Sequence, residues 1–135
     1  MKTELEKKLL EEFPSFFRDM YGDPRKTCMA WGCAHGDGWF DILYQLCKKL
    51  KKEVEKDPKV DFHFLQIKEK FARLTLYYSG GNKTIHRLVN EAEQKSDFVC
   101  EDCGTMESVS VDNSVYWLRT LCEECRNGRK TNPVK

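Results

Sequence analysis

The sequence predicts an α+β fold, in which a mainly helical body with a short β element precedes a C-terminal hairpin that carries four cysteines. Apolar residues recur at helical spacing through most of the chain before residue 97. One stretch, residues 74–78, is instead rich in aromatic and β-branched residues. Two Cys-x-x-Cys pairs stand near the C-terminus. We therefore expect a helical body over 1–97, a four-cysteine module packed on it over 98–127, and a mobile basic tail over 128–135.

Length and charge limit the classes of function. A chain of 135 residues that is 40% hydrophobic can form one compact domain, or a small domain plus a minor module. With 23 basic and 22 acidic residues the net charge is +1, which is not the basic surplus of a typical nucleic-acid binder, although a local basic patch stays open. The charged N-terminus does not resemble a signal peptide, and no apolar run approaches the roughly 20 residues that span a bilayer. We expect a soluble, cytoplasmic protein.

The chain begins with an expected amphipathic helix over residues 3–13. Thr3 and Glu6 have the spacing of a capping box, so we expect them to close the start of this helix. Pro14 ends the helix and can occupy the first turn of the next one. Phe16, Phe17, Met20 and Tyr21 are then expected to form a short, very apolar turn that Gly22 closes. A loop then runs to about Gly36.

The next expected helix opens at the segment His35-Gly-Asp-Gly-Trp39. Asp37 is the predicted N-cap, because its side chain can accept hydrogen bonds from the free N–H groups of the first turn. Apolar residues continue at helical spacing to Val54. The opposite face carries Lys48, Lys49, Lys51, Lys52 and Lys56. We interpret this face as solvated, and a patch that faces phosphate or acidic groups is the alternative.

Residues 60–78 are harder to assign. The spacing of the apolar residues Phe62, Leu65, Phe71 and Leu74 suggests a short helix around Leu65–Ala72. The following residues favour a strand, so helix or strand stays open for residues 72–78. Ser79-Gly-Gly81 is a clear turn. Asn82 or Thr84 is expected to cap a further helix that ends near Ser96.

The strongest chemical signal is Cys100-Glu-Asp-Cys103 followed, after 18 residues, by Cys122-Glu-Glu-Cys125. Zinc is held by about four soft ligands in a tetrahedron, and each Cys-x-x-Cys turn presents two sulfurs to one ion. The spacing is typical of a zinc ribbon. Four thiolates leave no open position for water, so we predict one structural Zn²⁺ rather than a catalytic one. Two disulfides or a redox pair are the alternatives, but the βαβ pattern of a thioredoxin-like site is absent.

The residues between the two pairs support a zinc-ribbon hairpin. Gly104 stands where a cysteine knuckle needs positive φ. Residues 109–111 alternate as in a strand, Asp112-Asn113 offers a turn, and Val115–Leu121 is the expected return strand.

Four further residues, Cys28, Cys33, His35 and Cys47, could in principle form a second metal site. Their spacing matches no common zinc pattern, and Cys47 falls within a helical apolar stripe. We therefore interpret them as buried or free thiols and a surface histidine, and keep the second site as an alternative.

Three segments in this order resemble a group of small, mostly uncharacterised proteins found in bacteriophage and prophage genomes. The first is Trp31-Gly-Cys-Ala-His-Gly-Asp-Gly-Trp-Phe-Asp41, where the group has a Gly-Asp-Gly-Trp helix start. The second is Ile67-Lys-Glu-Lys-Phe-Ala-Arg-Leu-Thr-Leu-Tyr77, which corresponds to Val-Lys-Glu-Lys-Phe-Gly-Gly-Leu-Arg-Phe-Tyr in the group. The third is Glu91-Ala-Glu93 followed by the cysteine ribbon and by Trp117-Leu-Arg-Thr-Leu-Cys122.

The chain also departs from this group. Ala72-Arg73 replaces a glycine pair, so a turn of the group is expected to be continuous helix here, and Thr75 replaces an arginine. His35 stands where the group often has cysteine. The resemblance implies phage origin and zinc binding, and phage accessory proteins of this kind often bind and disable a host protein, including a component of a defence system. That last step is an analogy of context.

No catalytic motif is evident, because the chain lacks a phosphate loop, a nucleophile elbow and a His-Glu-x-x-His pair. We predict a non-enzymatic protein that binds and modulates or inhibits a bacterial host protein in the host cytoplasm. The predicted partner-binding residues are Asp37, Trp39, Lys68, Lys70, Arg73 and Tyr77. The alternative is a nucleic-acid-binding zinc-ribbon protein of transcription or replication, against which the acidic character of the ribbon argues. An enzyme built on Cys33, His35 and Asp37 is the least favoured reading, since no nucleophile–base pair can be named.

Overall fold

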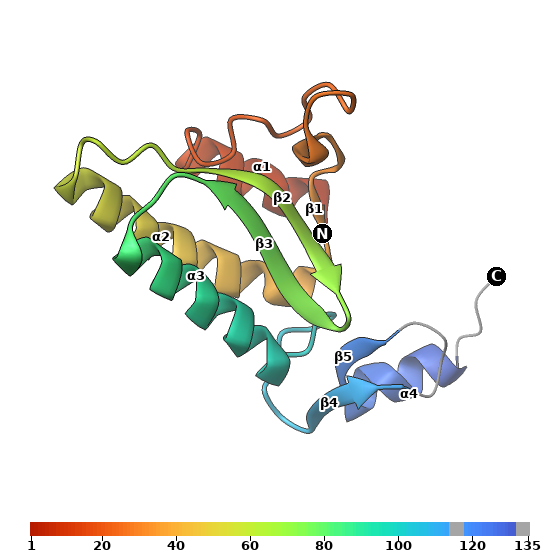
Figure 1. Ribbon diagram of the computed structural model, residues 1–135. Coiled ribbons are helices and arrows are strands. Elements are labelled where there is room, and N and C mark those ends of the chain that lie inside the picture. The colour runs from red at the N-terminus through yellow and green to blue at the C-terminus, as the bar shows by residue number, and fades with distance from the viewer. Residues whose placement is uncertain (114–117, 132–135) are drawn as a thin grey trace.

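The computed structural model describes residues 1–113 and 118–131, and it has the mixed α+β composition that the sequence predicts. Two long helices, α2 (Phe40–Lys56) and α3 (Lys83–Lys95), pack beside each other against a small sheet (Figure 1). A separate small module at the C-terminal end carries the four cysteines. No helix in the described part of the chain is long and apolar enough to cross a membrane.

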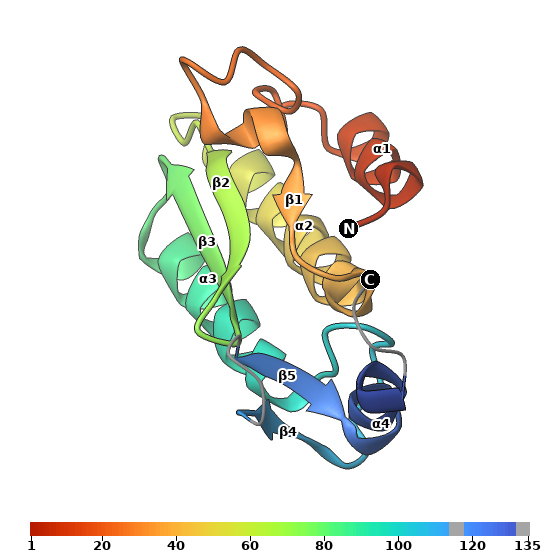
Figure 2. The same cartoon turned by 90° about the vertical axis from the view of Figure 1, so that its right-hand side faces the viewer.

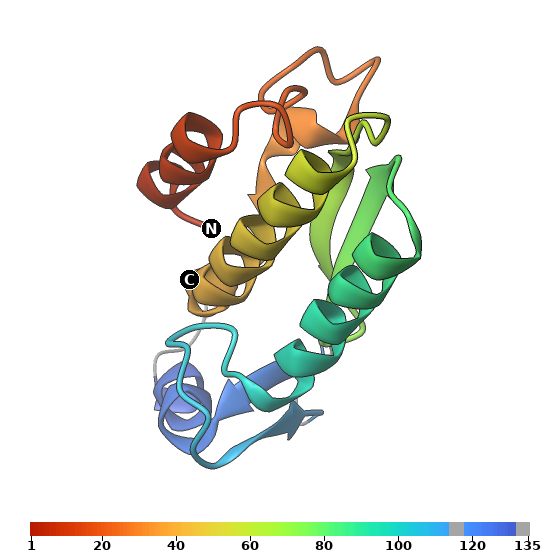
Figure 3. The same ribbon diagram turned by 90° about the vertical axis from the view of Figure 1, so that its left-hand side faces the viewer.

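The sheet has three strands in the order β1-β2-β3. The two-residue strand β1 (Cys33–Ala34) runs parallel to β2 (His63–Lys70), and β2 is antiparallel to β3 (Arg73–Ser79). Figure 3 shows α2 and α3 covering one face of this sheet. The core between these layers contains large, fully buried side chains, among them Trp39 and Phe64.

The strand β2 replaces the short helix expected around Leu65–Ala72, and that expectation is wrong. A β-bulge between Phe64 and Gln66 inserts one residue into the strand. Of the four apolar residues whose spacing suggests a helix, Leu65 and Phe71 are exposed while Phe62 and Leu74 are buried, so they do not form one apolar face. The strand expected after residue 73 is confirmed as β3.

The turn between β2 and β3 consists of Phe71 and Ala72, with φ of 52° and 67°. Both residues are in the left-handed region that favours glycine. The continuous helix expected here, because the chain lacks a glycine pair, is therefore wrong: the turn forms with non-glycine residues.

The outer edge of β3 is covered by side chains from the helical layer. The Leu74 N–H donates to Ser96 Oγ at 3.0 Å, and the Leu76 N–H donates to Glu93 Oε2 at 2.9 Å. These contacts satisfy two edge N–H groups that would otherwise be open to another strand. The predicted cap of α3 is confirmed at Asn82, whose Oδ1 accepts a hydrogen bond from the Ile85 N–H at 3.0 Å.

The N-terminal helix α1 (Thr3–Glu12) is present, but the predicted capping box is wrong. The N-cap is Lys2, and no side chain of the helix closes its start. Glu6 is buried instead, where it accepts hydrogen bonds from the Tyr21 hydroxyl at 2.7 Å and from the Cys33 N–H at 2.5 Å. A carboxylate with these interior partners is not available for capping. The short apolar turn expected after Pro14 is present, since residues 14–21 form turns.

The second face of the sheet is open. In Figure 2, β2 and β3 lie in front of α2 and α3, and no other described element crosses them. Directly opposite residues of two paired strands lie on the same face of a sheet. The pairs on the open face are Lys70 with Arg73, Lys68 with Thr75, and Gln66 with Tyr77. They alternate along the strands with residues of the buried core. The five lysines of α2 are exposed, as the solvated-face interpretation predicts.

Candidate metal centre and the joint that holds it

The four C-terminal cysteines converge on one point. The Sγ atoms of Cys100, Cys103, Cys122 and Cys125 all lie within 4.8 Å of one another. Cys103 Sγ and Cys122 Sγ are 3.7 Å apart. A tetrahedral site with Zn–S bonds of about 2.3 Å has edges of roughly 3.8 Å. The separation is far from the about 2.05 Å of a disulfide bond, so the two-disulfide alternative does not describe this arrangement. The cluster could hold a metal ion.

The first cysteine pair forms a knuckle. The Gly104 N–H donates to the Cys100 carbonyl at 2.9 Å, and the Cys100 N–H donates to the Thr105 carbonyl at 2.9 Å. Gly104 has φ of 83°, as the knuckle prediction requires. This tight turn points both sulfurs of the pair to the same side.

The second pair differs from the predicted ribbon. Strand β4 (Val109–Asp112) pairs with β5 (Arg119–Cys122), so a hairpin does lie between the cysteine pairs. Cys122 ends β5, however, and Cys125 lies in the first turn of helix α4 (Glu123–Thr131). The pair is therefore presented by a strand-to-helix junction and not by a second hairpin turn.

The described residues bear only partly on the predicted boundaries of this module. The first part of the return strand expected over Val115–Leu121 lies outside them, at residues 114–117. Helix α4 extends to Thr131, into the range expected to be a tail, and residues 132–135 of that tail again lie outside the described chain.

The two glycines of the Gly-Asp-Gly-Trp segment contact the cysteine knuckle. The Gly38 N–H donates to the Glu101 carbonyl at 2.7 Å, and the Gly36 N–H donates to Glu101 Oε2 at 2.8 Å. A Cβ atom at Gly38 would lie only 2.1 Å from the Cys100 carbonyl oxygen. Close approach of the knuckle backbone therefore requires glycine at this position.

Trp39 contacts the residue that precedes the knuckle, from within the core. Its side chain is fully buried, and its Nε1–H donates to the Val99 carbonyl at 2.8 Å. The prediction that Trp39 belongs to a partner-binding surface is wrong for this fold, because a buried indole is not available to a partner. The predicted N-cap role of Asp37 is also wrong. Asp37 begins a short 3₁₀ turn, and its Oδ1 accepts a hydrogen bond from the Lys2 N–H at 2.7 Å.

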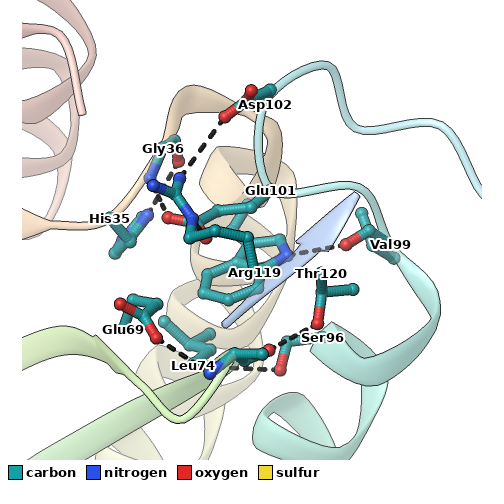
Figure 4. Close-up of polar contacts among 12 residues, drawn as sticks. His35, Gly36, Glu69, Leu74, Ser96, Val99, Glu101, Asp102, Arg119 and Thr120 are labelled. Carbon is teal, nitrogen blue, oxygen red and sulfur yellow. Dashed lines mark hydrogen bonds and ion pairs between the residues drawn. The ribbon is translucent and has the colours of Figure 1, made fainter. Parts of the chain in front are cut away.

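The cysteine module contacts the body at Gly36, Gly38, Glu101 and Arg119, and we call this contact region the joint. A buried carboxylate lies at its centre (Figure 4). Glu101 is only 1% exposed, and Arg119 Nε donates to its Oε1 at 2.8 Å. The same guanidinium donates to Asp102 Oδ1 at 3.4 Å. Burial raises the pKa of the Glu101 carboxyl, and the charge of Arg119 opposes that shift. The ion pair and the Gly36 N–H thus offset part of the cost of burying this charge.

The joint extends to the tip of the β2–β3 hairpin. Thr120 Oγ1 donates to the Ala72 carbonyl at 2.5 Å, and Glu69 Oε2 accepts a hydrogen bond from the Ala72 N–H at 2.8 Å. Beside them, Arg73 donates two hydrogen bonds to Asp97, at 3.1 and 2.8 Å. The cysteine module and the strained turn are therefore directly connected.

Sequence reasoning missed Glu101 and Thr120, which it treated as ordinary surface and strand residues. The partners of Glu101 lie 65 and 18 residues away in the chain, at Gly36 and Arg119. The partner of Thr120 lies 48 residues away. No local pattern reports contacts of such sequence separation.

The predicted partner-binding residues do not form one surface. Lys68, Lys70, Arg73 and Tyr77 lie together on the open face of the sheet. Asp37 is half-buried beside the start of α1, between the two glycines that contact the knuckle.

The second metal site is not formed. Among the residues that the structure describes, the C-terminal cluster is the one group of three or more potential ligands within reach of a single ion. Cys28 is exposed, whereas Cys33 and Cys47 are buried separately from that cluster. The surface position expected for His35 is wrong: it is buried against Trp39, with ring centroids 5.7 Å apart. Its Nδ1–H donates to the Gly36 carbonyl at 2.8 Å, and burial lowers its pKa to about 4.

Comparison of the chain with family models, with curated proteins and with solved structures finds no match.

Proposed function

We propose that this chain is a zinc-stabilised, non-enzymatic phage accessory protein that binds a bacterial host protein and modulates or inhibits it. By analogy with phage accessory proteins, a component of a defence system is one such host protein. The metal in this proposal is a single structural Zn²⁺ held by Cys100, Cys103, Cys122 and Cys125. The all-sulfur donor set and the 3.7 Å separation of two of its sulfurs support zinc, and four protein ligands leave no position for a reacting water.

The observation that carries the binding role is the open face of the sheet. Lys68 and Lys70 share this face with Arg73 and Tyr77. The β2 and β3 positions that face outward contain no carboxylate, although the whole chain is nearly neutral. The carboxylate of the intervening Glu69 instead holds the Ala72 N–H. Tyrosine and arginine are common anchors of protein interfaces, and the local positive charge favours a partner with acidic groups.

The buried state of Cys33 and His35 supports a non-enzymatic role. Burial raises the pKa of the Cys33 thiol to about 12, which keeps it in the weakly nucleophilic protonated form near neutral pH. His35 is almost completely enclosed, so it has no access to a substrate in solution. This pair therefore lacks both an activated nucleophile and an accessible base.

Nucleic-acid binding is the second candidate. The acidic residues of the cysteine module argue against it in the sequence, but one structural observation weakens that objection. Three ribbon acids, Glu107, Glu123 and Glu124, line a cavity of about 450 Å³ on the cysteine module. They do not contribute to the sheet face, so the basic face is not neutralised by them. The same lysines could contact phosphates, and such binding would weaken steeply with added salt.

A retention experiment separates the two candidates. The immobilised chain is exposed to bacterial lysate, with and without nuclease, and washed at elevated salt. We expect one specific polypeptide to be retained after both treatments by the wild type and by a K51E/K52E control, whose exchanged lysines lie on the exposed face of α2. K68E/K70E should lose that polypeptide. Disappearance of all retained material after nuclease treatment would transfer support to the nucleic-acid candidate.

Metal analysis tests the zinc part independently. We expect about one zinc per purified chain, because the four cysteines make one closed site. A chain purified with no metal, or with iron, would contradict this assignment.

A further inference from the structure

The tip of the β2–β3 hairpin presents an exposed aromatic side chain on a strained backbone. Phe71 is 79% exposed, and with φ of 52° it occupies the left-handed region. Ala72, the second turn residue, has φ of 67°. Two-residue hairpin turns with this geometry strongly favour Asn-Gly or Gly-Gly, because glycine meets no Cβ penalty there. Neither the geometry of the turn nor burial of apolar surface accounts for a phenylalanine at this position.

The strained turn is held rigidly in place. The Ala72 N–H and carbonyl are bound by the side chains of Glu69 and Thr120, and Ala72 itself is buried. The adjoining Arg73 is fixed by its two hydrogen bonds to Asp97. Strained conformations persist where their surroundings determine them in this way, and they concentrate at functional sites.

The charges beside Phe71 define what it can meet. Lys70 directly precedes Phe71 and is exposed, and Lys68 lies two residues earlier in β2 on the same face. No outward position of β2 or β3 on that face is acidic. The tip is thus an apolar ring on a fixed backbone with positive charge on one side.

We propose that Phe71 is the anchor of the partner interface, and that it inserts into an apolar pocket on a folded host protein whose rim carries carboxylates opposite Lys70 and Lys68. This inference rests on the proposed function and specifies its contact. A rigid anchor loses little conformational freedom on binding, so the rigid turn contributes to affinity. The aromatic ring supplies buried apolar area, as interface anchors commonly do.

The test combines stability with retention. F71G removes the ring and relieves the backbone, so its thermal midpoint should be equal to or above that of the wild type, while retention of the partner from nuclease-treated bacterial lysate should fall about tenfold or more. F98A is the matched control, because Phe98 is also exposed, at 65%, but lies in a short 3₁₀ turn and not at the hairpin tip. F98A should retain the partner as the wild type does. A benzoylphenylalanine placed at position 71 should crosslink the same polypeptide, and one placed at position 98 should not.

Several results would overturn the inference. A clear fall in the thermal midpoint of F71G would show that the ring contributes to folding. Retention by F71G at the wild-type level, in a preparation where K68E/K70E loses the partner, would leave the proposed function standing and remove Phe71 from it. A wild-type chain that retains no protein, or only nucleic acid, would refute the proposed function itself and this inference with it.

Discussion

Replacement of Gly38 by alanine tests the joint between the cysteine module and the body. The new Cβ would lie 2.1 Å from the Cys100 carbonyl oxygen and 2.6 Å from both the Glu101 carbonyl oxygen and the Gly104 nitrogen. All three neighbours are backbone atoms of the knuckle, so none can rotate away. The knuckle must therefore withdraw from the body or lose its own geometry.

The expected cost follows from two terms. Withdrawal breaks the 2.7 Å hydrogen bond from the Gly38 N–H to the Glu101 carbonyl, and loss of a buried hydrogen bond costs about 1 kcal/mol. Overpacking against fixed backbone adds about 1–3 kcal/mol. G38A should therefore lower the free energy of unfolding by roughly 2–4 kcal/mol.

Chemical denaturation of the metal-loaded protein measures this change, and competition with a chelator measures metal release. G128A is the matched control: a Cβ at Gly128 meets nothing within 4 Å, and an interior helix glycine replaced by alanine should stabilise by roughly 0.5–1 kcal/mol. We expect G38A to unfold earlier and to release metal faster than both the wild type and G128A. If G38A matched the wild type in both measurements, the close backbone contact between Gly38 and the knuckle would be refuted.

Three further predictions follow from the joint and its surroundings. Removal of the metal should unfold β4, β5 and α4 while the body persists, because the module has its own small core; hydrogen exchange that stays unchanged after chelation would contradict this. T120V should cost about 1–3 kcal/mol by leaving the buried Ala72 carbonyl without its hydroxyl donor, measured by denaturation, and hydrogen exchange should rise at the hairpin tip. The pKa of His35 is 6.5 in the unfolded chain and about 4 in the folded chain, so the unfolded chain binds a proton first as the pH falls. The free energy of unfolding should therefore decrease between these two pH values, by up to about 3 kcal/mol. H35Q should remove that part of the pH dependence, and an identical pH profile in the two proteins would exclude His35 as its source.

What the sequence could predict is what local patterns determine. The helical spacing of apolar residues locates α2 and α3, and Asn82 is identified as a cap by its position before an apolar run. The four cysteines are recognisable because metal ligation imposes residue type and spacing together. The same reasoning fails for β2, because Leu65 and Phe71 are exposed, so their spacing with Phe62 and Leu74 does not mark a face that packs on the core.

The glycines of the Gly-Asp-Gly-Trp segment show a different limit. A glycine in a sequence indicates either conformational freedom or the close approach of another backbone, and local context does not separate the two. Here Gly38 has a knuckle against it that is more than 60 residues away in the chain. Local context likewise predicts a surface position for Trp39, because the segment that contacts its indole is remote in the sequence.

The cysteine module and the open face are better understood together than apart. Each cysteine pair belongs to, or adjoins, a segment that contacts the body. The knuckle of the first pair contacts Gly36 and Gly38, and β5, which leads into the second pair, contacts Ala72 through Thr120. A metal ion that joins the pairs would hold both segments in register, and β5 in turn holds the turn that presents Phe71. A closed structural site can therefore support binding without touching the partner, since it maintains a strained turn that the hairpin residues alone do not favour. On this argument, the loss of metal should weaken partner retention even where Lys68, Lys70 and Phe71 are all intact.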